Sequence, residues 1–275
     1  MAPSKLPVVI VTGASRGLGL AIVREVLSLG AHVLGTARSE ESLVRLQREW
    51  QESRPATDAD QPEFTFIAGD ITKSATGDLL VAAALKQFGR IDAVIHNAGI
   101  IEPVAKLADA DLDAWRTLFD VNLFSIIGLT QKALPHLRER RGRVVMVGSG
   151  AAVKAITGWS AYCCSKAALY RLTDCLAAEE PDVTTLAVAP GVVDTDMQIF
   201  IRERANAAMK PSEHERFTNM KQSGQLVQPD QPGHVIAQLA LHADHELSGQ
   251  CLYWTDACFR TFRKPRNSRP PSPRA

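Results

Sequence analysis

The chain alternates short apolar runs with longer amphipathic stretches, and this alternation constrains its fold more than any other feature. The short runs are rich in Val and Ile, and several are apolar on both faces, as buried parallel strands are. Strands are predicted at residues 8–12, 32–36, 64–68, 93–96, 144–147, 185–189 and 251–254. Helices are predicted at residues 18–29, 40–50, 76–88, 112–138, 161–179 and 232–242. Right-handed crossovers then give an α/β fold, a doubly wound parallel sheet with helices on both faces.

The length of 275 residues suits one such domain, which we expect over residues 1–263. Residues 264–275 are basic and rich in proline, and we expect a disordered tail because they cannot bury enough apolar surface. Residues 52–62 predict a surface loop. Residues 197–228 interrupt the alternation and predict a helical excursion beyond the sheet, a candidate lid.

Composition argues against several classes of function. The net charge is +1, which gives no electrostatic basis for binding nucleic acid or a membrane surface. No apolar run approaches the ~18 residues that a bilayer span needs, and the first residues leave no room for a signal peptide. We therefore expect a cytoplasmic protein. The five cysteines include no CxxC pair, so neither a disulfide framework nor a metal site is predicted.

A glycine-rich turn joins the first predicted strand to the first predicted helix. Glycines at such a turn let the backbone approach a pyrophosphate, and the helix N-terminus supplies free N–H groups and a partial positive charge. The spacing is G-x-x-x-G-x-G, looser at its first step than the usual dinucleotide fingerprint. The residues expected to hold the cofactor here are Gly13, Ser15, Arg16, Gly17, Leu18 and Gly19.

The second predicted strand indicates which dinucleotide is bound. Arg38 stands where an acidic residue would bind the ribose 2′-hydroxyl of NAD, and Arg16 lies inside the glycine loop. Two guanidiniums, with Ser39 as a further donor, favour the 2′-phosphate of NADP(H). Glu40 and Glu41 keep NAD open, although acids also suit the start of the next helix.

Two more strand ends point to the same edge of the sheet. Asp70 and Ile71 follow the third strand, and Asp70 is placed to bind the adenine amino group. Asn97, Ala98 and Gly99 follow the fourth strand, where small side chains allow a ribose to approach. Ligands of open α/β sheets bind beyond the carboxyl ends of the strands, so we expect all these residues to line the same crevice.

A second group of residues predicts proton transfer to a carbonyl oxygen. Tyr162 and Lys166 are four residues apart in a predicted helix and face the same way. A free tyrosine has a pKa of ~10, and we expect the Lys166 ammonium to lower it so that Tyr162 exchanges protons near neutral pH. Ser149, at a strand end, is placed to hold the substrate oxygen. Asn122 is placed to hold a water beside Lys166.

In this combination and order, these residues resemble the short-chain dehydrogenase/reductase family. The resemblance runs from Leu6 to about Trp254 and implies a single Rossmann-type domain with a seven-stranded parallel sheet. It implies homodimers or homotetramers that pair through the helices at 112–138 and 161–179. In the family the segment after the sixth strand holds the nicotinamide carboxamide. By resemblance, that role falls to Pro190, Gly191, Val193 and Thr195.

The sequence departs from the family at two positions. His96 stands where the family usually has an Asn, and Gly148 precedes Ser149 where another Ser is common. The first departure is expected to be structural, and the second removes one hydroxyl from the pocket wall.

Further stretches, among them 97–104, 158–162 and 189–195, are similar to fungal benzil reductases, relatives of sepiapterin reductase. Such enzymes reduce one carbonyl of an α-diketone with NADPH. With Ser149 and Tyr162, Trp159 and Met197 are then candidates for contacting the small-molecule substrate, although ordinary core packing explains these two apolar side chains equally well.

Two other functions remain open. A regulator that binds NADP(H) without turnover would need the glycine loop but not Asn122, Ser149, Tyr162 and Lys166 together. An alcohol or steroid dehydrogenase of the same fold would use NAD, which Arg16 and Arg38 disfavour.

Overall fold

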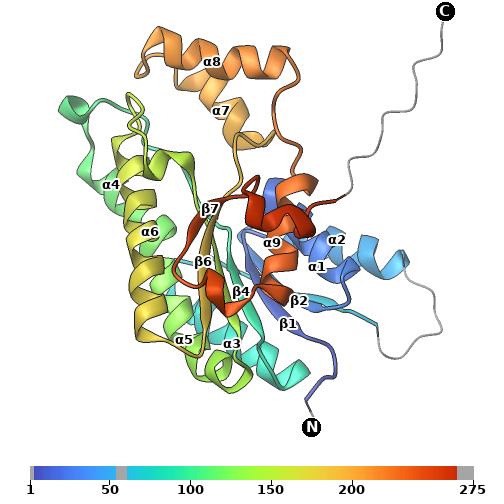
Figure 1. Ribbon diagram of the computed structural model, residues 1–275. Coiled ribbons are helices and arrows are strands. Elements are labelled where there is room, and N and C mark those ends of the chain that lie inside the picture. The colour runs from blue at the N-terminus through green and yellow to red at the C-terminus, as the bar shows by residue number, and fades with distance from the viewer. Residues whose placement is uncertain (1–2, 54–60, 265–275) are drawn as a thin grey trace, which may run out of the picture.

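The computed structural model describes residues 3–53 and 61–264, which fold around one parallel β-sheet (Figure 1). Its seven strands lie in the order β3-β2-β1-β4-β5-β6-β7, and every neighbouring pair is parallel. The strands are β1 Val8–Thr12, β2 His32–Ala37, β3 Phe64–Ala68, β4 Ala93–His96, β5 Arg143–Val147, β6 Thr184–Ala189 and β7 Cys251–Tyr253. The predicted doubly wound fold is confirmed, and each strand end lies within one residue of its predicted place.

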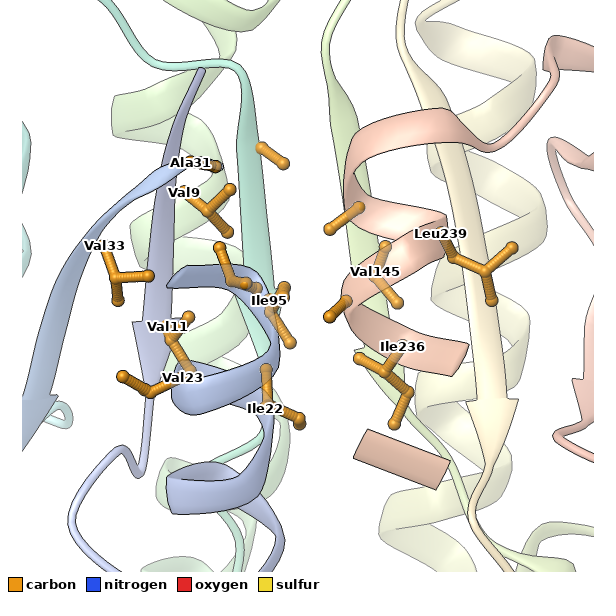
Figure 2. Close-up of a cluster of buried hydrophobic side chains, with 14 of the residues drawn as sticks. Val9, Val11, Ile22, Val23, Ala31, Val33, Ile95, Val145, Ile236 and Leu239 are labelled. Atoms are coloured by element: carbon orange, nitrogen blue, oxygen red, sulfur yellow. The ribbon is translucent and has the colours of Figure 1, made fainter. Parts of the chain in front are cut away.

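Helices cover both faces of the sheet because the strands are apolar on both sides. Val9 and Val11 of β1 pack with α1 Gly17–Ser28, α2 Glu40–Glu52 and α9 Asp230–His242. Figure 2 shows this core, in which Ile22 and Val23 of α1 approach the strands beside Ile236 and Leu239 of α9. The opposite face of β1 packs with α3 Ser74–Phe88, α5 Ser125–Arg140 and α6 Ser160–Glu179.

Local signals fix where several helices begin and end. The Ser39 side chain caps α2 by accepting the N–H of Ser42, and Asp111 caps α4 Leu112–Phe119 in the same way. Gly89 ends α3 in the left-handed conformation, with φ 71°, which glycine adopts without steric cost.

The predicted helix at 112–138 is not continuous. α4 is followed by the π-helical turn η2 Asp120–Phe124, and only then does α5 begin. The interruption centres on Asn122, whose side chain is fully buried and bonds to groups outside the helix. A π-turn often occurs at a functional site, and helical periodicity does not reveal it because the apolar stripe continues through the turn.

The excursion at 197–228 forms α7 Asp196–Arg204 and α8 Pro211–Gln222, which stand clear of the sheet at the top of Figure 1. Short helical turns complete the fold: η1 Leu107–Asp109, η3 Gly150–Ala152, η4 His245–Leu247 and η5 Ala257–Phe262. Among the described helices, none is long and apolar enough to cross a bilayer. Most of the predicted loop at 52–62 and, beyond Lys264, the predicted tail fall outside the described residues.

Candidate active site

The carboxyl edge of the sheet opens into a cleft of about 1630 Å³. The strand order reverses between β1 and β4, which is the point where ligands of doubly wound folds bind. The predicted site residues that line the cleft are Gly13, Ser15, Arg16, Gly17, Leu18, Gly19, Arg38, Ser39, Asp70, Ile71, Asn97, Ala98, Gly99, Ser149, Trp159, Tyr162, Lys166, Pro190, Gly191, Val193, Thr195 and Met197. Asn122 lies behind the wall of the cleft, fully buried.

The glycine loop is held against the end of β4. The Asn97 amide Nδ2 donates to the carbonyl oxygens of Thr12 and Gly13, at 3.0 and 3.2 Å. Gly13 has φ 68°, and a Cβ there would lie 2.8 Å from Asn97 Nδ2. A Cβ on Gly19 would lie 1.9 Å from the Gly13 carbonyl oxygen. Glycine is therefore required at both positions by the packing of the loop itself.

The N-terminus of α1 opens on this loop and suits an anion. Among the described residues no side chain caps α1, and its first turn contains no acidic residue. The first N–H groups of a helix have no intrahelical partner, and the helix dipole favours negative charge there. Gly17 and Leu18 of this turn line the cleft, so the loop fits the pyrophosphate of a dinucleotide.

Cationic and polar side chains gather at the outer end of the cleft. Arg38 is exposed there, beside Asp70, Thr72 and Lys73. Thr72 donates its N–H and its hydroxyl to Asp70 Oδ1, at 3.0 and 2.9 Å. These bonds, with the charges of Lys73 and Arg38, lower the pKa of Asp70. Ser39 lies next to them, but its hydroxyl already caps α2.

Arg16 makes a contact that the sequence did not predict. Its guanidinium pairs with Asp196 at the start of α7, with 2.6 Å between Nη1 and Oδ2. Both side chains are largely exposed, so the ion pair by itself contributes little to the stability of the fold. It nevertheless links the glycine loop to the candidate lid. Of the two arginines predicted to bind one phosphate, Arg38 lacks such a carboxylate partner among the described ion pairs.

Asn122 fastens the loop that follows β4. Its Oδ1 accepts the N–H of Ile100 at 2.9 Å, and its Nδ2 donates to the Ile100 carbonyl at 2.9 Å. Nδ2 also lies 3.2 Å from the Ser165 hydroxyl. The side chain thus joins the 97–101 loop to α6 through the π-turn. The water that Asn122 is expected to hold beside Lys166 remains a prediction.

Tyr162 and Ser149 both line the cleft, and the Ser149 hydroxyl is near enough to Tyr162 to influence its pKa. The Ser149 Oγ also accepts the N–H of Ala151 at 3.1 Å, which leaves its proton to point elsewhere. Burial raises the pKa of Tyr162, and the nearby Ser149 side chain opposes that rise. Among the described residues Ser149, rather than Lys166, is therefore the group that lowers the pKa of Tyr162.

Lys166 lies on the same side of α6 as Tyr162, as predicted from their spacing. Its Nζ is 5.8 Å from the centre of the Tyr162 ring and donates to the Val147 carbonyl at 2.8 Å. The ammonium therefore lies between the Tyr162 ring and the end of β5. Burial lowers the pKa of Lys166 to about 8.

Aromatic side chains form the wall beyond Tyr162. The Trp159 ring meets Tyr162 edge-on, with centroids 5.9 Å apart, and stacks on Phe217 of α8 at 5.4 Å. Met197 of α7 and Ile101 belong to the same apolar cluster. Because α7 and α8 supply part of this wall, the excursion beyond the sheet shapes the space next to Tyr162.

His96 is buried beneath the site, with 2% of its surface exposed, and its Nε2 lies 2.8 Å from the Thr130 hydroxyl. Burial lowers its pKa from 6.5 to about 3, so it is neutral in the folded protein at ordinary pH. Its role is structural, as the sequence predicted.

His96 should make the fold sensitive to acid. Between about pH 6.5 and 3 the unfolded chain binds a proton here that the folded chain does not, so stability falls as pH falls. Between about pH 7 and 5 the wild type should lose about 2 kcal/mol more than His96→Asn, which keeps a polar partner for Thr130 but does not titrate. Urea unfolding of both proteins at both pH values measures the difference; equal losses would contradict the buried, neutral histidine.

Other residues line the cleft that sequence reasoning missed, among them Glu102, Lys73, Lys154, Phe217 and Tyr253. Tyr253 ends β7 at the carboxyl edge, so the strand-end rule that found Asp70 and Asn97 would have found it too. Phe217 is brought in by α8 and carries no such signal.

Comparison with known proteins agrees with this geometry. The family described as short chain dehydrogenase matches residues 7–206. An uncharacterised oxidoreductase of Schizosaccharomyces pombe is 42% identical over 258 residues, covering 92% of this chain and 98% of the relative. A benzil reductase ((S)-benzoin forming) of Saccharomyces cerevisiae is 41% identical, covering 90% of this chain and 96% of the relative.

Solved structures agree with these sequence relatives. A short chain dehydrogenase/reductase from Saccharomyces cerevisiae has a TM-score of 0.88 at 40% identity, covering 94% of this chain and 100% of that one. The sheet order, the uncapped helix at the glycine loop and the Ser149–Tyr162–Lys166 group fit that likeness. The chain therefore belongs to the short chain dehydrogenase family, whose members are oxidoreductases that bind a nicotinamide cofactor.

Proposed function

We propose that this protein is an NADPH-dependent carbonyl reductase that converts a ketone or a benzil-type α-diketone into the hydroxy compound. The observation that carries the proposal is that Ser149, Tyr162 and Lys166 line one cleft, with Lys166 one turn further along α6 and its Nζ 5.8 Å from the centre of the Tyr162 ring. The relative named benzil reductase supports the substrate class.

The reaction needs a hydride for the carbonyl carbon and a proton for the carbonyl oxygen. Bound reduced nicotinamide supplies the hydride. The Tyr162 hydroxyl gives the proton, and Ser149 holds the carbonyl oxygen next to it. Since burial raises the pKa of Tyr162, the phenol is protonated at neutral pH, which suits a proton donor in the reductive direction. Lys166, with Asn122 behind it, is then placed to return a proton to Tyr162 from solvent.

The same cleft supports a preference for NADP(H). We assign the pyrophosphate to the N-terminus of α1 and the 2′-phosphate to Arg38, with Ser39 nearby. Lys73 adds a second cation at that end. The nicotinamide carboxamide is assigned to Val193 and Thr195, which line the same cleft.

Assembly and location are also proposals. Leu112 of α4 and Phe124 of the π-turn are 63% and 56% exposed, which supports pairing of these helices in a homodimer or homotetramer. We propose a cytoplasmic location, and a solved relative, 39% identical, is described as a cytoplasmic protein from Saccharomyces cerevisiae.

A panel of carbonyl compounds tests the function. Benzil, a second α-diketone, a quinone, sepiapterin and a simple aldehyde are each mixed with the enzyme and NADPH, with NADH in parallel, and loss of reduced nicotinamide is followed. Turnover of the diketones with NADPH, and little with NADH, is the expected result. Tight NADPH binding without turnover of any compound would favour a regulator that binds NADP(H) without turnover over the reductase.

A further inference from the structure

Tyr253 is a polar side chain in the wall of the cleft that the proposed reaction does not use. It is the last residue of β7, and it lines the cleft together with Ser149, Gly150 and Tyr162. The residue is 39% exposed. Across residues 3–53 and 61–264 its hydroxyl has no hydrogen-bond partner, so this phenol is free to bond to a molecule in the cleft.

The backbone of Tyr253 is held firmly on both sides. Tyr253 is paired with Ala189 of β6, and the N–H of the next residue, Trp254, donates to the Ala189 carbonyl at 3.0 Å. The Tyr253 N–H donates to Asp256 Oδ2 at 2.8 Å, and its carbonyl accepts the Asp256 N–H at 2.9 Å. The side chain therefore projects from a fixed strand end, as a residue that recognises a ligand should.

The hydroxyl end of the Tyr253 ring reaches the turn that follows Ser149. A Cβ on Gly150 would lie 3.1 Å from the Tyr253 hydroxyl oxygen and 3.8 Å from the nearest ring carbons. Gly150 is not among the glycines with positive φ, so its backbone does not demand glycine. The missing side chain instead leaves room for the phenol. Its oxygen thus stands one residue along the wall from Ser149, which is proposed to hold the reacting carbonyl oxygen.

We propose that Tyr253 selects α-diketones over simple ketones: its hydroxyl donates to the second carbonyl oxygen while Ser149 and Tyr162 hold the one that is reduced. The proposal rests on the proposed reductase function. The two oxygens of an α-diketone are on neighbouring carbons, so a donor one residue along from Ser149 is placed to reach the second. A ketone with a methylene there leaves the phenol to water. Because Tyr253 is partly exposed, this costs less than a buried unpaired group would, and the preference is modest.

Two substrates that differ at one atom test the proposal. Deoxybenzoin is benzil with one carbonyl replaced by a methylene, so it lacks the second oxygen. Tyr253→Phe should lower kcat/KM for benzil about fivefold, the usual worth of one hydrogen bond between neutral groups. For deoxybenzoin the same variant should change kcat/KM by less than about twofold, because the bond is absent from both complexes. Equal losses with both substrates would assign Tyr253 a merely structural role, and that result or an unchanged value for benzil would overturn the proposal.

A second readout needs no turnover. Enzyme saturated with NADP+ has no hydride to give, so the Kd of each compound can be measured by equilibrium dialysis. Tyr253→Phe should raise the Kd for benzil about fivefold and leave that for deoxybenzoin in place. Thr255→Val is the matched control, since it removes a hydroxyl from an exposed residue that does not line the cleft, and both Kd values should equal those of the wild type.

An unchanged Kd for benzil in Tyr253→Phe overturns the proposal. If the wild type reduces no carbonyl compound, the proposed function fails instead, and the two Kd values still decide whether Tyr253 recognises the second oxygen.

Discussion

Tyr162→Phe is expected to lower kcat for carbonyl reduction by about a thousandfold or more, because the variant lacks the hydroxyl that donates the proton but keeps the aromatic ring. Ser149 cannot replace it, since a hydroxyl of serine is a far weaker acid than a phenol. The rate of loss of reduced nicotinamide with the best diketone of the panel measures the effect. A rate near that of the wild type would show that Tyr162 does not donate the proton.

Cofactor binding is the control for this variant. Phenylalanine keeps the ring that meets Trp159 edge-on, so the walls of the cleft should stay in place. The Kd for NADPH, measured by the fluorescence of the bound nicotinamide, should change by less than about twofold, since Phe retains the packed ring. If the Kd for NADPH rises strongly while kcat falls, the variant disturbs the cleft and not the proton transfer alone.

The second large effect is expected for Arg38→Asp. The wild type should prefer NADPH, and the variant should lose about ten- to a hundredfold in kcat/KM for NADPH, since a hydrogen bond to a charged group is worth about 1.5–3 kcal/mol. Aspartate at this position can accept the 2′-hydroxyl of NADH, so kcat/KM for NADH should rise. Initial rates over a range of each cofactor give both values.

Arg45→Asp is the matched control. It makes the same change of charge on α2, at an exposed residue that does not line the cleft. Its preference for NADPH should equal that of the wild type, because exposed charges more than ~10 Å apart are screened at ordinary salt. If the preference is unchanged in Arg38→Asp as well, the 2′-phosphate does not bind at Arg38.

The strands and most residues that line the cleft could be predicted from local patterns in the sequence. Val and Ile runs such as 8–11 can only be buried, and the residues after each run must share one edge of a parallel sheet. Asp70, Asn97 and Ser149 were found this way. Tyr162 and Lys166 needed only helical spacing, and that spacing holds over all of α6.

What the sequence could not supply depends on contacts between elements. At the π-turn the Asn122 side chain binds the peptide group of Ile100, 22 residues earlier in the chain and outside its own helix. The pairing of Arg16 with Asp196 joins residues 180 positions apart. The burial that raises the pKa of Tyr162 was not foreseen either, since helical spacing does not show how deeply the ring is enclosed. Each of these is fixed by packing that no local window contains.

The most direct test of the central claim is the reduction of benzil by the wild-type enzyme, with NADPH consumed and benzoin formed measured in the same reaction. We predict one benzoin for each NADPH oxidised and a much lower rate with NADH. NADPH that binds but yields no benzoin from benzil, nor a hydroxy compound from any other ketone, would contradict the assignment of Tyr162, Ser149 and Lys166 to carbonyl reduction.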